Sequence, residues 1–194
     1  MFVLESIKKY AMSDRIALVN REETLSFAEL DARSDAFAMY LLESLGEDRT
    51  EIVIYGHKET DILPCMYGAL KAGRGYVPID ITVPVDRVQQ IVDDVQPKVI
   101  VDFYGIGLRS DGVILSAETL RDRISCFLGC EVPKENWIKG ETPAYILFTS
   151  GSTGKPKGVP ITAANIENLY SGLLPWMTGE GVILNQISYS FDVS

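Results

Sequence analysis

The chain has 194 residues and is 46% hydrophobic, which is enough to bury one sizeable core, so we expect one domain or part of one. Its net charge of −9 argues against nucleic acid as a main partner, because binding a phosphate backbone requires a basic face. No apolar run approaches the roughly 18 residues of a membrane helix. Residues 1–10 also lack the apolar stretch of a signal peptide. We therefore expect a cytoplasmic protein without stable membrane insertion.

Three cysteines, an odd number, do not make a disulfide framework. Cys126 and Cys130 lie four residues apart and can share a helix face, which raises the question of a metal. The single histidine, His57, is distant in the sequence and leaves the ligand set short. We expect reduced thiols and no metal held by protein side chains alone.

Helices and strands alternate in the first half of the chain. Ser26 and Glu29 fit a capping box, and apolar residues at helical spacing follow them as far as the stop at Gly46. A proline at position 78 marks its strand as short or near a sheet edge. The predicted elements are a helix over residues 27–45, a strand over 52–55, a helix from Ile62 that is closed by Gly73, and a strand over 76–79.

The alternation continues in the second half. A helix is predicted from Pro84, with one apolar face through Val95, and strands follow over 99–101 and 113–115. Ser116 is expected to cap a helix that runs to about Ile124, and residues 126–143 form a surface connection. The last predicted elements are a strand over 144–148, a helix capped by Thr162 that runs to about Leu174, and a strand over 182–184. Repeated alternation with apolar strands predicts an α/β domain with a mainly parallel sheet and flanking helices.

The most informative segment is residues 145–159. An apolar strand runs into six consecutive Thr, Ser and Gly residues at 149–154, and Lys155 and Lys157 follow on either side of a proline. Small residues let backbone N–H groups approach an anion, hydroxyls add donors, and lysines add charge. A flexible Ser/Gly linker fits this setting poorly because apolar strands flank it closely. The segment therefore predicts a polyphosphate-binding loop.

Two familiar nucleotide loops do not match. A Walker A loop would need glycine at position 149, which is Thr149, and Ser or Thr at position 156, which is Pro156. A proline there also removes a backbone donor. A dinucleotide fingerprint that begins at Gly105 fails because Ser110 stands where a third Gly or Ala belongs.

The loop instead resembles the signature loop of the adenylate-forming superfamily, which includes acyl-CoA synthetases, luciferases and nonribosomal peptide adenylation domains. Further segments resemble motifs of amino-acid-activating members and occur in family order across nearly the whole chain. These segments are residues 25–30, residues 70–80, Pro84 with Arg87, and the terminal F-D-x-S at 191–194. Residues 84–91 are most similar to D-alanine:D-alanyl carrier protein ligases.

The resemblance implies a reaction and partners. ATP, with Mg²⁺ bridging phosphate oxygens, would activate an amino acid, D-alanine under the closest resemblance, as an aminoacyl-adenylate. The phosphopantetheine thiol of a carrier protein would then take the acyl group, for lipoteichoic acid in the cell wall of Gram-positive bacteria. A nonribosomal peptide synthetase domain for another amino acid, and a non-catalytic nucleotide-binding or carrier-docking fragment, are the alternatives.

The resemblance also implies roles for individual residues. Lys157 would neutralise the departing pyrophosphate as the catalytic residue, and Asp192 would pair with the α-ammonium of the substrate. A helix N-cap is the alternative interpretation of Asp192. The phosphates of ATP would be held by Thr149, Ser150, Gly151, Ser152, Thr153, Gly154 and Lys155. No complete protein ligand set for Mg²⁺ is visible in the sequence.

The sequence stops at Ser194 without a cap or a polar tail. We expect residues 1–194 to form the N-terminal part of an AMP-binding adenylation domain, whose C-terminal subdomain is absent. The adenine-binding, ribose-binding and C-terminal lysine motifs of the family would lie beyond residue 194. We therefore expect this chain alone not to complete adenylation.

Overall fold

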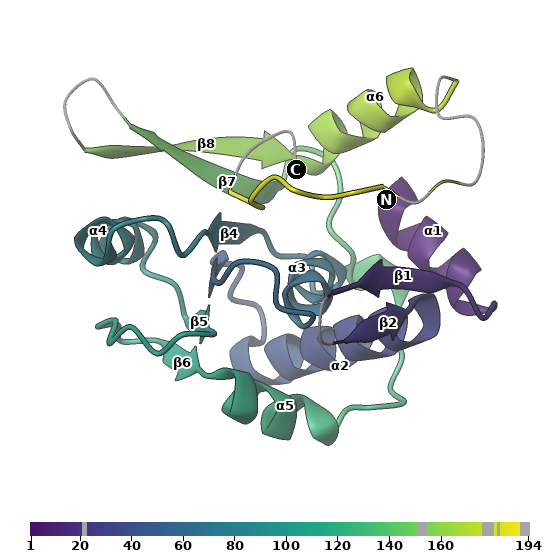
Figure 1. The fold of residues 1–194 in the computed structure, drawn as a ribbon, viewed down its shortest axis with the longest axis horizontal. Helices are drawn as coiled ribbons and strands as arrows, with labels where there is room; N and C mark the ends of the chain where they lie inside the picture. The colour runs from purple at the N-terminus through teal and green to yellow at the C-terminus, as the bar shows by residue number, and fades with distance from the viewer. Residues whose placement is uncertain (21–22, 151–154, 176–180, 182, 191–194) are drawn as a thin grey trace.

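The computed structural model describes residues 1–20, 23–150, 155–175, 181 and 183–190. Its centre is a six-stranded sheet with the strand order β6-β5-β3-β4-β7-β8, in which the first five strands are parallel and β8 runs antiparallel to β7 (Figure 1). The strands are β3 (Ile52–Tyr55), β4 (Tyr76–Ile79), β5 (Val99–Asp102), β6 (Val113–Leu115), β7 (Pro143–Ser150) and β8 (Pro156–Thr162). A separate antiparallel ribbon pairs β1 (Ile16–Val19) with β2 (Thr24–Ser26). The prediction of an α/β fold with a mainly parallel sheet is confirmed.

The helices pack on both faces of this sheet (Figure 1). They are α1 (Phe2–Ala11), α2 (Phe27–Leu45), α3 (Ile62–Lys71), α4 (Val85–Val95), α5 (Ala117–Ser125), the 3₁₀ helix η1 (Lys134–Asn136) and α6 (Ala163–Leu173). Side-chain alternation along β3 separates two cores. Ile52 and Ile54 join the core with α2 and α3, whereas Val53 and Tyr55 join a core with α4. Strands covered on both faces are apolar throughout, as the sequence predicted.

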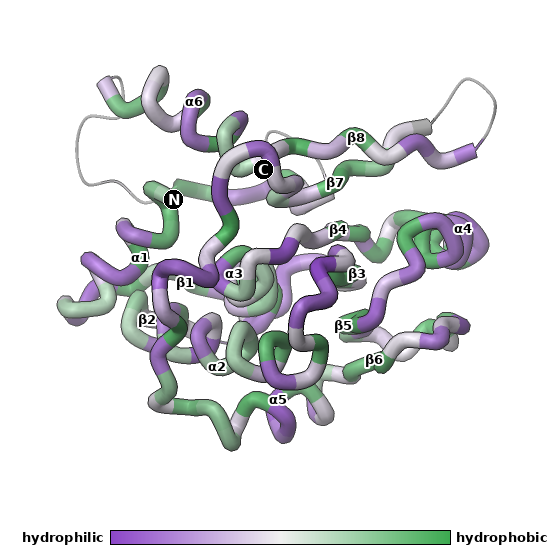
Figure 2. The backbone as a smooth tube through the Cα atoms, turned by 180° about the vertical axis from the view of Figure 1, so that it is seen from behind, coloured by the Kyte–Doolittle hydropathy of each residue, from purple (hydrophilic) through white to green (hydrophobic). Residues whose placement is uncertain are grey.

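Helix α4 shows how the sequence selects its packing face. Val88, Ile91 and Val92 are buried against the sheet, and Figure 2 shows hydrophobic and hydrophilic residues alternating along its turns. The predicted helix starts are also confirmed. Ser26 and Glu29 form the reciprocal capping box, and the Ser116 and Thr162 side chains accept hydrogen bonds from backbone N–H groups of their helices.

Strand β4 is short, as its proline predicted, and it lies inside the sheet; the proline is tolerated there because β7 pairs with β4 only at Tyr76. Two sequence expectations were wrong in part. The predicted surface connection at 126–143 contains the buried residues Val132, Trp137 and Ile138 and the helix η1. Residues 183 and 184 lie in no strand, and residue 182 is outside the described residues. The elements α1, β1, β2 and β8 were not predicted.

Candidate functional site

The predicted phosphate loop connects two paired strands. Strand β7 ends at Ser150, and β8 returns antiparallel from Pro156, so the two strands form one hairpin (Figure 1). The rest of β8 separates Lys157 from the next helix, α6. The loop therefore does not lead into a helix N-terminus as a Walker A loop does, which agrees with its exclusion from the sequence.

Thr149 and Lys157 are register partners across this hairpin. The Thr149 hydroxyl donates to the Lys157 carbonyl at 3.4 Å, and both residues are exposed, as is Lys155. Neither lysine forms an ion pair with any carboxylate in the part of the chain that the structure describes. Two ammonium groups are thus available to an anion at the base of the loop.

The glycine after the second lysine lets the hairpin close tightly. A Cβ atom at Gly158 would lie 3.0 Å from Ile146 Cγ2 and 3.1 Å from Phe148 Cζ on the paired strand. A larger residue at this position would require the Ile146 and Phe148 side chains to move by a few tenths of an ångström. The glycine therefore lets these two β7 side chains pack closely over β8.

Several predicted site residues lie outside the described residues. These are Gly151, Ser152, Thr153, Gly154 and Asp192. The backbone of Ser150 belongs to β7, as the register partner of Pro156. The structure therefore brings together Thr149, Lys155 and Lys157, and the roles of the remaining residues stay predictions.

A second polar cluster lies at the carboxyl ends of β3 and β4. Asp80, only 3% exposed, accepts a hydrogen bond from the half-exposed His57, with Nδ1 and Oδ2 2.7 Å apart. Burial alone would raise the pKa of Asp80, but hydrogen bonds from His57, Thr82 and Ser188 outweigh it and lower the pKa to about 2. Sequence analysis did not single out Asp80, although its place directly after a strand was a usable signal.

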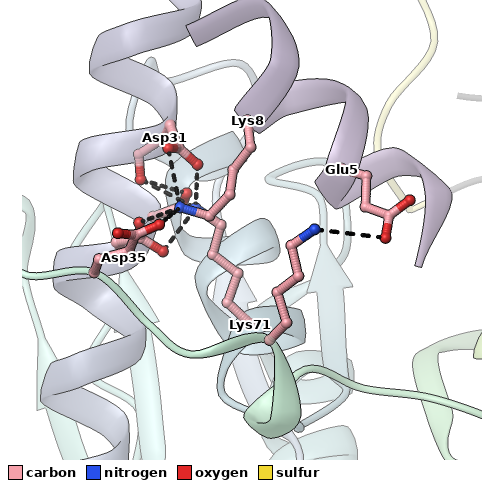
Figure 3. Close-up of polar contacts among 8 residues, drawn as sticks. Glu5, Lys8, Asp31, Asp35 and Lys71 are labelled. Atoms are coloured by element: carbon pink, nitrogen blue, oxygen red, sulfur yellow. Dashed lines mark hydrogen bonds and ion pairs between the residues drawn. The ribbon is translucent and has the colours of Figure 1, made fainter. Parts of the chain in front are cut away.

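A third cluster is buried between helices α1, α2 and α3 (Figure 3). The Lys71 ammonium, fully buried, lies 2.6 Å from Asp31 Oδ1 and 2.9 Å from Asp35 Oδ1. The Lys8 ammonium bridges the same two aspartates and lies 2.8 Å from Glu131 Oε1. Burial would lower the pKa of Lys8, but Glu131, Asp35 and Asp31 together raise it above its ordinary value. The charges satisfy one another, so this cluster fixes α1 against the domain.

The sequence is similar to those of known enzymes along nearly its whole length. The family model described as AMP-binding enzyme matches residues 5–194. The chain belongs to the AMP-binding enzyme family. Two curated relatives in this family are named D-alanine--D-alanyl carrier protein ligase. The protein from Bacillus thuringiensis (strain Al Hakam) is 34% identical over 204 residues, and the one from Bacillus licheniformis is 33% identical over 202 residues.

Both alignments cover all of this chain but only 40% and 39% of those relatives, so this AMP-binding chain spans about two fifths of their length.

Solved structures share its fold. VinN in complex with L-aspartate has a TM-score of 0.84 at 22% identity, covering 99% of this chain and 56% of that one. The Klebsiella oxytoca NpsA N-terminal subdomain, in complex with 3-hydroxyanthranilyl-AMSN, has a TM-score of 0.66 at 23% identity, covering 83% and 39%. At these identities the likeness concerns the fold alone.

Among the described residues, no helix combines the length and apolar character needed to cross a bilayer. The same residues contain no group of three or more His, Cys, Asp or Glu side chains placed to hold a metal ion.

Proposed function

We propose that the full-length protein carrying this chain is an ATP-dependent ligase that activates an amino acid, D-alanine, and passes it to a carrier protein. The observation that supports this most is the hairpin of β7 and β8 in a member of the AMP-binding enzyme family. It presents, beside a Thr/Ser/Gly loop, two lysines that have no ion-pair partner among the described residues. The names of relatives that cover the whole chain support the choice of D-alanine and of a carrier protein.

The first step joins the amino acid to AMP. A carboxylate oxygen attacks the α-phosphorus of ATP, the bond to the bridging oxygen breaks, and its electron pair leaves with pyrophosphate. We assign the loop from Thr149 to Lys155 to holding the β- and γ-phosphates in line for this attack. Lys157 neutralises the charge that grows on the leaving pyrophosphate. The Asp192 carboxylate pairs with the substrate ammonium.

The second step transfers the acyl group. The thiol sulfur of a carrier-protein phosphopantetheine attacks the acyl carbon, AMP leaves with the electron pair of the broken C–O bond, and the thiol proton passes to solvent or AMP. ATP enters as its Mg²⁺ complex. Because the described residues offer no metal-ligand group, we assign no side chain of this chain to that ion. The product supplies D-alanine for lipoteichoic acid in a cytoplasmic step of cell-wall assembly.

A second candidate is the activation of another amino acid. The solved structure of VinN with L-aspartate, and that of the nonribosomal peptide synthetase FmoA3 with α-methyl-L-serine-AMP at a TM-score of 0.69 and 20% identity, share this fold. These two structures contain different amino acids, so the fold alone does not select D-alanine.

Amino-acid-dependent ATP–pyrophosphate exchange by the full-length protein tests both candidates. We expect the highest kcat/KM with D-alanine in a panel that includes L-alanine, L-aspartate and L-serine. Asp192→Asn should raise the KM for the amino acid by about 100-fold, because a buried ammonium loses its charged partner. Asp122→Asn, a change of the same kind on the exposed face of α5, is the control. A preference for another amino acid selects the second candidate, and the absence of any exchange would overturn both.

A further inference from the structure

Residues 185–190 lie against the carboxyl ends of β3 and β4. A small pocket there is lined by Gly56 after β3, by Pro78 and Ile79 of β4, and by Ser188, Tyr189 and Ser190. In Figure 1 these last residues belong to the yellow trace that leads to the C-terminal end. The segment has no regular secondary structure, so side chains of the domain must determine its position.

Lys58, in the loop after β3, contacts three residues of this segment. Its Nζ atom donates to Asn185 Oδ1 at 2.9 Å and to the Ile187 carbonyl, and it lies 3.8 Å from the centre of the Tyr189 ring. Two hydrogen bonds and a cation–π contact from one ammonium hold alternate residues of the segment. Burial lowers the pKa of Lys58, as expected for an ammonium partly withdrawn from water.

Asp80 lies beside the same segment at the end of β4, where His57 and the Thr82 hydroxyl fix its carboxylate, each at 2.7 Å. The Ser188 side chain helps to lower the pKa of Asp80. Within the segment, the Ser188 hydroxyl accepts a hydrogen bond from the Ser190 backbone N–H at 3.2 Å, two positions before Asp192.

We propose that Lys58 is a positioning residue that clamps residues 185–190 so that Asp192 meets the ammonium group of the amino acid substrate. This inference rests on the proposed function, which gives Asp192 that role. A charge-assisted contact loses strength when its carboxylate is displaced by even 1 Å. The clamp therefore acts on amino acid binding and leaves the phosphate loop, on the β7–β8 hairpin, unaffected.

The test compares two Michaelis constants of the full-length protein in pyrophosphate exchange. Lys58→Ala should raise the KM for the amino acid at least tenfold and change the KM for ATP less than twofold. Ser188→Ala should raise the same constant by a smaller factor of about threefold, since it removes one contact and leaves Lys58 in place. Lys58→Arg should restore most of the lost affinity, because a guanidinium can donate to both oxygens and stack on Tyr189.

Lys134→Ala is the matched control. Lys134 also lies over an aromatic ring, with Nζ 5.4 Å from the centre of Trp137, but it belongs to η1, away from the segment. It should leave both constants within twofold of the wild type.

Hydrogen exchange measured by mass spectrometry tests whether Lys58 holds residues 185–190 in place, and it does not require enzyme activity. Lys58→Ala should increase exchange at least tenfold in the peptide containing residues 185–190, with core peptides unchanged. Unchanged exchange there would overturn the clamp. Two outcomes would show that the clamp does not position the substrate. One is faster hydrogen exchange with an unchanged KM for the amino acid, and the other is an equal rise in the KM for the amino acid and for ATP. If the wild-type protein shows no amino-acid-dependent exchange of pyrophosphate, the proposed function fails along with the substrate-positioning role, while hydrogen exchange still decides the clamp.

Discussion

Two groups of lysine and aspartate side chains among the described residues differ in their partners. Lys71, Lys8, Asp31 and Asp35 are surrounded by α1, α2 and α3, and their charges are satisfied within the group and by Glu131. At the carboxyl ends of the strands, Asp80 accepts hydrogen bonds from His57 and Thr82, and the nearby Lys58 donates to a segment without regular structure.

The difference separates a structural role from a positioning one. A closed cluster of buried charges holds its helices together because removing one partner leaves an unpaired buried charge, which strongly destabilises the fold. A cluster that reaches outward to a loop fixes the place of that loop, and a change there alters binding more than folding. Disrupting each cluster in turn therefore distinguishes the two roles.

The largest expected effect on stability is at Lys71. Lys71→Met leaves Asp31 and Asp35 sharing only Lys8, and breaking a buried pair in this way costs about 3 to 5 kcal/mol of the free energy of unfolding. Urea denaturation of the full-length protein measures this loss. Lys134→Met, at a mostly exposed lysine, is the control and should cost less than about 0.5 kcal/mol. A loss below about 1 kcal/mol at Lys71 would show that the buried cluster does not hold the helices together.

Replacing Asp80 should lower the free energy of unfolding by a smaller amount that depends on pH. Its pKa falls from an ordinary 3.8 to about 2 in the folded chain, so its charge stabilises the fold above pH 4 and this contribution is lost as the pH falls toward 2. The difference corresponds to roughly 2 kcal/mol. Asp80→Asn should remove this amount at pH 7 and flatten the acid side of the stability profile, measured by denaturation from pH 7 to pH 2. If the free energy of unfolding of the variant depended on acidic pH as that of the wild type does, the stabilising role of the Asp80 charge would be contradicted.

Much of the fold could be predicted because its signals are local. The capping box at Ser26, the apolar face of α4 and the continuous apolar strands each depend on residues that are close in the sequence. The Thr/Ser/Gly loop and its lysines are also a local pattern, and their role in phosphate binding stays a prediction. Strand β8 escaped prediction because its glycine and prolines read as loop residues, whereas its pairing with β7 provides the hydrogen bonds.

The polar clusters could not be predicted because their partners are distant in the sequence. Nothing near Lys71 indicates that its ammonium lies against Asp31, and nothing near His57 points to Asp80. Only the sheet order, which places β4 beside β3, brings His57 and Asp80 together. The residues of the candidate site that depend on such contacts, Lys58 and Asp80, were therefore found only from the structure.

The most direct test of the central claim compares the affinities of the full-length protein for ATP and for AMP, measured by equilibrium competition. If the hairpin holds the β- and γ-phosphates, Lys157→Ala should weaken ATP binding about tenfold or more and leave AMP binding within twofold, because AMP lacks those phosphates. Lys139→Ala, at an exposed lysine before β7, should change neither affinity. An equal loss for both nucleotides, or no loss for either, would contradict the role given to this hairpin.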